Sequence, residues 1–99
     1  MENEKKNVNI SQVDENHYRT KDFYSAAVLL ASGESLLTLE KTTHNFVIFI
    51  FNTPVTIAVK TLSSHWGRTL RIPTRDIIEA INELKTRMHE TLNRQGGEL

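Results

Sequence analysis

The chain contains no cysteine. This absence excludes a disulfide framework, a zinc–thiolate site and a thiol nucleophile. No apolar run approaches the about 18 residues that a membrane-spanning helix requires, and the segment from Met1 to Asn16 lacks the apolar stretch of a secretory signal. We therefore expect a cytoplasmic protein with no membrane partner.

The sequence also lacks catalytic and metal-binding motifs. No two of its histidines stand two or four residues apart, the spacing typical of a metal-binding pair. A nucleophile elbow, a glycine-rich phosphate loop and a zinc-protease motif are all missing. We predict no catalytic residue, no metal site and no cofactor, and we expect the protein not to be an enzyme. An active site assembled from distant segments is the alternative, because it would escape a motif search.

The residues that are present have the composition of one folded domain. Hydrophobic residues make up 38% of the chain and charged residues 24%, which is ordinary for a globular protein and unlike a disordered one. At 99 residues the chain has room for a single core. Residues 1–17 are polar and show no periodicity. We therefore predict a mobile tail over 1–17, a domain over 18–94 and a frayed C-terminus over 95–99.

The first predicted helix begins at Thr20 and ends at Gly33. The Thr20 hydroxyl is placed to cap a free N–H of the first turn, and Gly33 is placed as the left-handed residue that ends the helix. Apolar residues at helical spacing share one face: Phe23, Ala26, Ala27, Leu30 and Ala31. The alanines make this face shallow, so another element is able to approach it closely.

A hairpin follows, with strands over 36–41 and 46–51 and a polar turn between them. The second strand is apolar on both faces. Phe46, Ile48 and Ile50 point one way, and the alternate residues point the other way: Val47, Phe49 and Phe51. A strand of this kind needs a layer above and a layer below. Helices or a second copy of the chain are the candidates for those layers.

The segment from Val55 to Trp66 has apolar residues at helical spacing, but its β-branched residues also alternate as in a strand. We predict a helix closed by Gly67, with a strand over 55–60 as the alternative. A short third strand is predicted over 69–72. The last helix begins at Thr74 and carries a stripe of apolar residues: Ile77, Ile81, Leu84, Met88 and Leu92. The fold class is thus α+β, a single small domain in the order α-β-β-α-β-α, with a three-stranded, mostly antiparallel sheet packed by helices.

Part of the sequence resembles a family of small bacterial and phage-associated proteins that is catalogued only as a domain of unknown function. The similar residues are Lys21-Asp22-Phe23-Tyr24, Ala26-Ala27, Leu29-Leu30-Ala31, Gly33 and Leu37, then Phe49 and Phe51, then Asp76, Ala80-Ile81 and Leu84-Lys85. The resemblance covers about residues 18–90 and implies a hairpin followed by a closing amphipathic helix. Its motifs are mostly apolar, and it implies no activity and no catalytic residue.

In the middle part of the chain basic residues exceed acidic ones. Residues 60–75 contain several basic side chains and one tryptophan: Lys60, His65, Trp66, Arg68, Arg71 and Arg75. Basic groups pair with phosphates and a tryptophan stacks on an unpaired base, so this segment is a candidate nucleic-acid-binding site. The alternative is structural, because Trp66 also completes the apolar stripe of its helix and would then lie in the core. The excess of basic charge is also small for a nucleic-acid-binding protein.

The apolar residues supply a second candidate, an interface formed by Phe46, Ile48, Ile50, Met88 and Leu92. Large exposed apolar patches mark interfaces, and symmetric dimers are the commonest oligomers. The alternative is that helices cover both faces of the sheet and bury these residues. We predict a non-enzymatic macromolecular interaction module that is homodimeric, with a nucleic-acid-binding accessory protein as the alternative. The expected partners are a second copy of the chain, nucleic acid or another protein.

Overall fold

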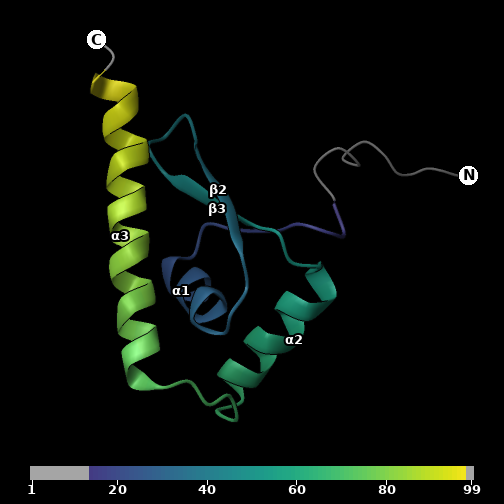
Figure 1. The fold of residues 1–99 in the computed structure, drawn as a ribbon. Helices are drawn as coiled ribbons and strands as arrows, with labels where there is room; N and C mark the ends of the chain where they lie inside the picture. Colours follow the sequence, from purple (N-terminus) through teal and green to yellow (C-terminus); the bar gives the residue numbers. More distant parts are fainter. Residues whose placement is uncertain (1–13, 98–99) are drawn as a thin grey trace, which may run out of the picture.

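The computed structural model describes residues 14–97 and contains three helices and one three-stranded antiparallel sheet (Figure 1). In chain order the elements are β1 (Tyr18–Thr20), α1 (Phe23–Ala31), β2 (Leu36–Lys41), β3 (Val47–Phe51), α2 (Val55–Trp66) and α3 (Thr74–Gly97). The predicted α+β class, with three helices and a three-stranded sheet in one small domain, is confirmed. Segment 55–66 is a helix, as predicted, and the strand alternative is wrong.

The third strand lies elsewhere in the chain than predicted. Residues 69–72 form no strand. The third strand of the sheet is β1, which pairs with β3, so that β3 is the central strand in the order β1-β3-β2. The alternation of Leu70 and Ile72 does have a structural cause, because both side chains pack against the core. The backbone there is bonded to the end of α2 rather than to a strand, so the strand pattern was misleading.

The ends of the ordered domain also differ from the prediction. Residues 14–17, expected in the mobile tail, are held by the body of the protein: the carbonyl oxygen of Glu15 accepts from the N–H of Val55 at 2.9 Å, and the N–H of Tyr18 donates to Thr53 at 3.1 Å. The rest of the predicted tail, 1–13, lies outside the described residues. At the other end α3 continues to Gly97, past the expected end at 94.

One face of β3 forms the centre of the core. Phe49 and Phe51 are 1% and 0% exposed, and they belong to one buried cluster with residues of all three helices. Burying a phenylalanine side chain contributes about 1.5–3 kcal/mol, so this pair is a major source of stability. The shallow face of α1, with Ala26 and Ala27 buried, packs closely against α3.

The first helix begins two residues later than predicted. Its N-cap is Asp22, whose carboxylate accepts from the N–H of Ser25 at 3.0 Å. The Thr20 hydroxyl accepts from the N–H of Asp22 instead, so it braces the cap rather than the helix. Gly33 has a φ of 100°, which confirms its predicted role as the left-handed residue after the helix.

The opposite face of β3 lies outside the main core. Ile50 is 3% exposed, yet it is not part of the core cluster. Arg19 on β1 pairs with Ile50 in register and Glu40 on β2 pairs with Ile48, so the two charged residues flank β3 on the same face. Their side chains meet across β3, with Nη1 of Arg19 3.6 Å from Oε1 of Glu40. This ion pair lies on the outer side of the strand, where we had expected a further layer of helix or a second chain.

The second helix, α2, is attached to the core by little apolar surface. Only Ala58 and Leu62 of its residues are buried. The predicted stripe also included Val59 and Trp66, which are 49% and 71% exposed. The core therefore meets α2 on a face that is rotated away from the predicted one, and much of the helix faces solvent. Within residues 14–97, no helix is both long enough and apolar enough to cross a membrane.

Two residues of α3, one leucine and one isoleucine, test how this helix packs on the core. Leu84 is 0% exposed and Ile78 is 51% exposed. We expect Leu84→Ala to lower the free energy of unfolding by about 2–5 kcal/mol, because it leaves a cavity in the core cluster, whereas Ile78→Ala changes it by about 0.5 kcal/mol or less. Urea denaturation of both variants measures the difference. Equal losses in the two variants would contradict the placement of α3.

Candidate functional site

The predicted basic segment lies where α2 ends and the chain crosses to α3 through the link of residues 67–73 (Figure 1). Leu70 and Ile72 anchor this link to the core. The N–H groups of Thr69 and Leu70 both donate to the carbonyl oxygen of Ser64, at 2.9 and 3.2 Å. These bonds give the link a fixed path. They also satisfy a C-terminal carbonyl of α2 that would otherwise present partial negative charge to an anion.

The structure brings Arg68 and Arg71 together on the outside of the link. Nη1 of Arg71 donates to the carbonyl oxygen of Arg68 at 3.3 Å, and both side chains are exposed. Arg68 has a φ of 66°, a left-handed conformation that is costly for a residue other than glycine. Among the ion pairs of residues 14–97, neither arginine has an acidic partner. Two guanidinium groups are therefore available to an anionic ligand.

Trp66 stands beside these arginines and is exposed to solvent. Its side chain is 71% exposed, and its ring centroid lies 5.0 Å from that of His65, with the ring planes tilted by 57°. The alternative that placed Trp66 in the core is wrong. Tryptophan is highly buried on average, so an indole this exposed, next to two arginines without acidic partners, is an unusual feature for a small domain.

The other two predicted basic residues flank this group. Lys60 is exposed on α2, earlier in the helix than Trp66. Arg75 lies in the first turn of α3, where its Nε is 3.0 Å from Oε2 of Glu79. Its side chain is 86% exposed, and an exposed pair of this kind contributes little stability. Arg75 is thus partly neutralised, whereas the positive charge of the link is not.

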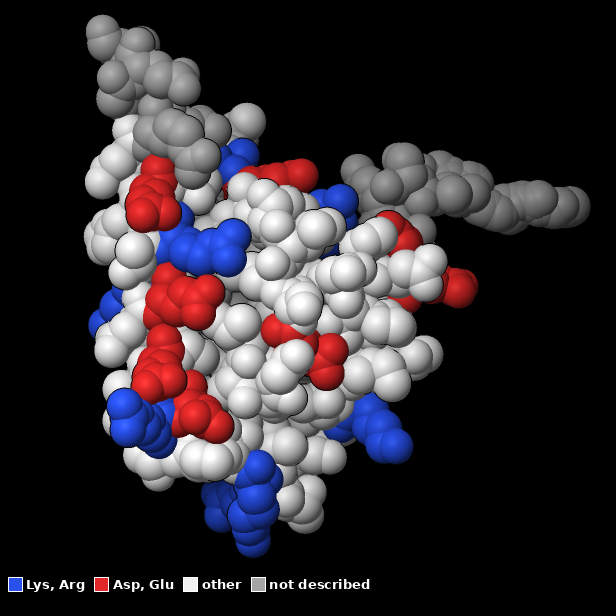
Figure 2. Space-filling view, in the orientation of Figure 1, with Lys and Arg blue, Asp and Glu red and all other residues white. Residues whose placement is uncertain are grey.

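Acidic side chains are concentrated along α3 on the face shown in Figure 2. Acidic side chains follow α3, whose exposed residues include Asp76, Glu79, Glu83 and Glu90. Basic side chains stand at the end of the molecule where α2 and α3 are joined, and others lie among the acidic side chains along α3 (Figure 2). The site is therefore positive on one side and bounded by negative charge along α3.

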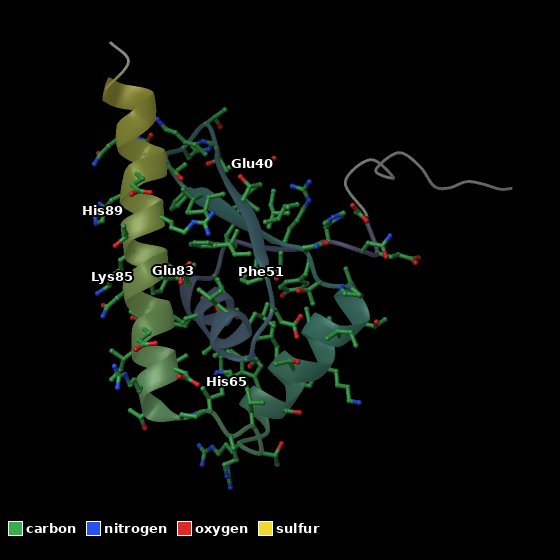
Figure 3. The ribbon with its side chains drawn as sticks, viewed as in Figure 1. Glu40, Phe51, His65, Glu83, Lys85 and His89 are labelled. Atoms are coloured by element: carbon green, nitrogen blue, oxygen red, sulfur yellow. The ribbon has the colours of Figure 1, made fainter. Side chains whose placement is uncertain are left out.

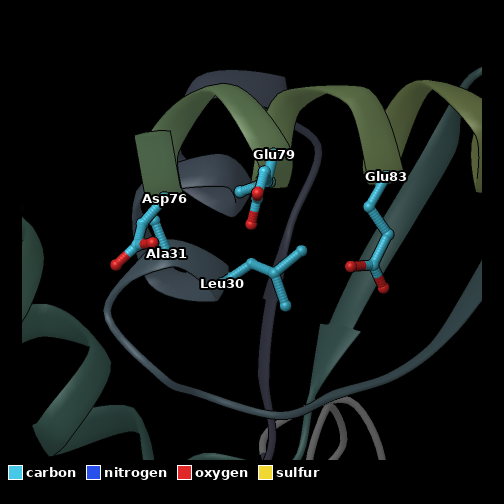
Figure 4. A pocket seen from close by; sticks show the side chains of 6 residues that line it. Leu30, Ala31, Asp76, Glu79 and Glu83 are labelled. Atoms are coloured by element: carbon cyan, nitrogen blue, oxygen red, sulfur yellow. The ribbon is translucent and has the colours of Figure 1, made fainter. Parts of the chain in front are cut away.

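A cleft between α1 and α3 carries part of this negative charge (Figure 4). It has a volume of about 240 Å³ and is lined by Leu30, Ala31, Asp76, Glu79, Ala80 and Glu83. Within residues 14–97, no three histidine or acidic side chains are grouped so as to hold a metal ion. The cleft therefore acts here as an acidic surface, one that disfavours an anionic ligand on this side of α3.

The five residues predicted to form an interface do not form one surface. Phe46 is 61% exposed at the hairpin turn, Ile48 is half-buried and Ile50 is buried on the outer side of β3. Met88 and Leu92 lie on α3 and pack against the core cluster of the same chain. The exposed apolar area at the predicted interface is thus limited to the hairpin end.

Within residues 14–97, His17 and Asp14 form the one histidine–carboxylate pair, and we assign it a structural role. His17 and Asp14 form a hydrogen bond within one turn of the chain. A hydrogen bond from the backbone N–H of Asn16 lowers the pKa of Asp14, and the bond to His17 lowers it further. A carboxyl group held in its ionised form is a poor general acid near neutral pH, so this pair serves to shape the segment before β1.

The sequence indicated the six residues of the candidate site but not their arrangement. It did not predict that Trp66 is exposed or that Arg68 and Arg71 meet. One signal was present in the sequence: no acidic residue occurs between Lys41 and Arg75. Such a segment carries a local excess of positive charge despite a net charge of zero for the whole chain.

Comparisons of this chain with protein-family models, with curated proteins and with solved structures find no match. The site is therefore interpreted from its own geometry and charge.

The strained residue of the link provides a test of the site's backbone. We expect Arg68→Gly to raise the free energy of unfolding by about 0.5–1 kcal/mol, because glycine adopts a positive φ at little cost. Thermal unfolding of the variant measures this gain. Arg71→Gly is the control, since Arg71 is not among the residues with positive φ and should give no gain. A loss of stability in Arg68→Gly would contradict the description of the link.

Proposed function

We propose that this protein is a non-enzymatic binding module that holds nucleic acid with unpaired bases at the junction of α2 and α3. The observation that carries the proposal is Trp66, an indole exposed at 71% that precedes Arg68 and Arg71 in the chain; neither arginine has an acidic partner within residues 14–97. Base stacking on an aromatic ring contributes about 1–3 kcal/mol per base and is open to every base type. Duplex DNA hides its base faces, so a single strand or an RNA loop is the better ligand.

The arginines supply the second part of the interaction. Arg68 and Arg71 lie on one side of a link that hydrogen bonds and core contacts hold in place. A guanidinium group binds a phosphate through two parallel N–H bonds. Because the link is already ordered, binding costs little further conformational entropy. The left-handed Arg68 fits this role, since backbone strain is often retained where a side chain serves a ligand.

Self-association through the outer side of β3 is the weaker proposal. Phe46 is exposed there, but Ile50 is already buried within its own chain and a charged pair, Arg19 and Glu40, lies on the same side. Met88 and Leu92, which the dimer would use, pack inside their own chain. The resemblance to a family of unknown function adds no activity and is compatible with either proposal. A cytoplasmic location also stays a proposal, one that would give the module access to nucleic acid.

Fluorescence tests the proposal directly, because Trp66 is the sole tryptophan of the chain. Titration with an oligothymidylate of about 12 nucleotides at about 50 mM salt should quench the indole emission as bases stack on it. The same titration followed by anisotropy of a labelled oligonucleotide gives the affinity. We expect Trp66→Ala to weaken binding by about 5- to 150-fold, the range for one stacked base.

Charge removal at the link provides the matched comparison. Arg68→Ala with Arg71→Ala should weaken binding at least about tenfold and reduce the slope of log K against log salt by about 1.4, the value for two phosphate contacts on a single strand. The control, Lys85→Ala with Arg87→Ala, removes the same charge from α3 and should change affinity by about twofold or less. Absence of binding by the unmodified protein, or an equal loss in both double variants, would overturn the proposal.

A further inference from the structure

We infer that the bound strand runs from the link along the outward face of α2, past Trp66 and Val59 to Lys60, and does not follow α3. The inference rests on the proposed function and adds the path of the ligand. It comes from three observations on α2 and α3: the residues that α2 exposes, their charge, and the acidic side chains of α3.

The outward face of α2 is continuous from its first turn to its last. Residues three and four apart share a helix face, and the exposed ones run together as Thr56, Val59, Lys60, Ser63 and Trp66. This face offers two hydroxyl groups, one ammonium group and two apolar side chains. Hydroxyls and ammonium groups bind phosphate and sugar, and apolar side chains pack against bases. The residue types therefore match a nucleic-acid strand along the length of the helix.

The spacing of the two apolar residues suits two bases about three nucleotides apart. Val59 and Trp66 are seven positions apart, which places them on one flank of α2, about 10 Å from each other along its axis. A stacked strand advances about 3.4 Å per nucleotide, so this distance spans about three nucleotides. Val59 is 49% exposed, because the core buries only Ala58 and Leu62 of this helix. A base resting on Val59 would cover an apolar side chain that the fold leaves in solvent.

The charge pattern favours a route over α2 rather than along the start of α3. Helix α2 contains no acidic residue. The start of α3, by contrast, presents Asp76, Glu79 and Glu83 along the cleft shown in Figure 4, and Glu79 already pairs with Arg75. Electrostatic interactions at the surface reach about 8 Å at physiological salt, so a phosphate close to α3 meets these carboxylates while a phosphate over α2 does not.

Two lysines allow this path to be tested with a matched pair. Lys60 lies on the outward face of α2, and Lys85 lies on α3, on the side that faces away from the sheet (Figure 3). We expect Lys60→Glu to weaken binding of the oligothymidylate at least about fivefold and to reduce the salt slope, because it places a carboxylate under a phosphate. Lys85→Glu, an identical charge reversal, should change the affinity by about twofold or less.

The remaining outcomes separate the path from the proposed function. Lys60→Gln keeps the side chain exposed and uncharged, so a smaller loss in the same direction would show that the effect of Lys60→Glu is electrostatic rather than a folding defect. The path would be overturned if the unmodified protein bound the oligothymidylate but Lys85→Glu weakened binding as much as Lys60→Glu, or more. The proposed function would then still stand. No binding by the unmodified protein would remove both.

Discussion

Burial of one face of β3 is the interaction on which the rest of the structure depends. Phe49 and Phe51 on this face are almost wholly removed from solvent, and α1 and α3 supply most of the side chains that enclose them. Most of the buried helical residues belong to these two helices. The third helix, α2, contributes only Ala58 and Leu62 to the buried residues. The exposure of Trp66 follows, since no surface of the small core remains to cover it.

Much of the fold was predictable from local pattern. The helices follow from apolar spacing, the hairpin from its two apolar strands and polar turn, and the end of α1 from Gly33. The third strand was not predictable, because Leu70 and Ile72 alternate as a strand would while their backbone is bonded to the end of α2. The short β1 has no distinctive pattern, and its place in the sheet depends on pairing with β3, which is distant in sequence.

For the candidate site, the sequence indicates which residues to consider but not their geometry. Helical spacing alone does not show whether Leu62 or Trp66 lies at the centre of the buried face, because that depends on how α2 packs against α1. Nor does the sequence show that Arg68 adopts a left-handed conformation, which brings Arg71 to its carbonyl oxygen. The segregation of charge in space was partly visible, since the segment from Lys41 to Arg75 has no acidic residue.

Mapping by nuclear magnetic resonance tests the central claim most directly, because it locates a ligand without changing the protein. Titration of the isotope-labelled protein with oligothymidylate should shift the indole N–H of Trp66 and the amides of the link, together with amides of α2, while those in the middle of α3 stay in place. The account would be contradicted if no resonance moved, or if the largest shifts fell on α3 or on the outer side of β3.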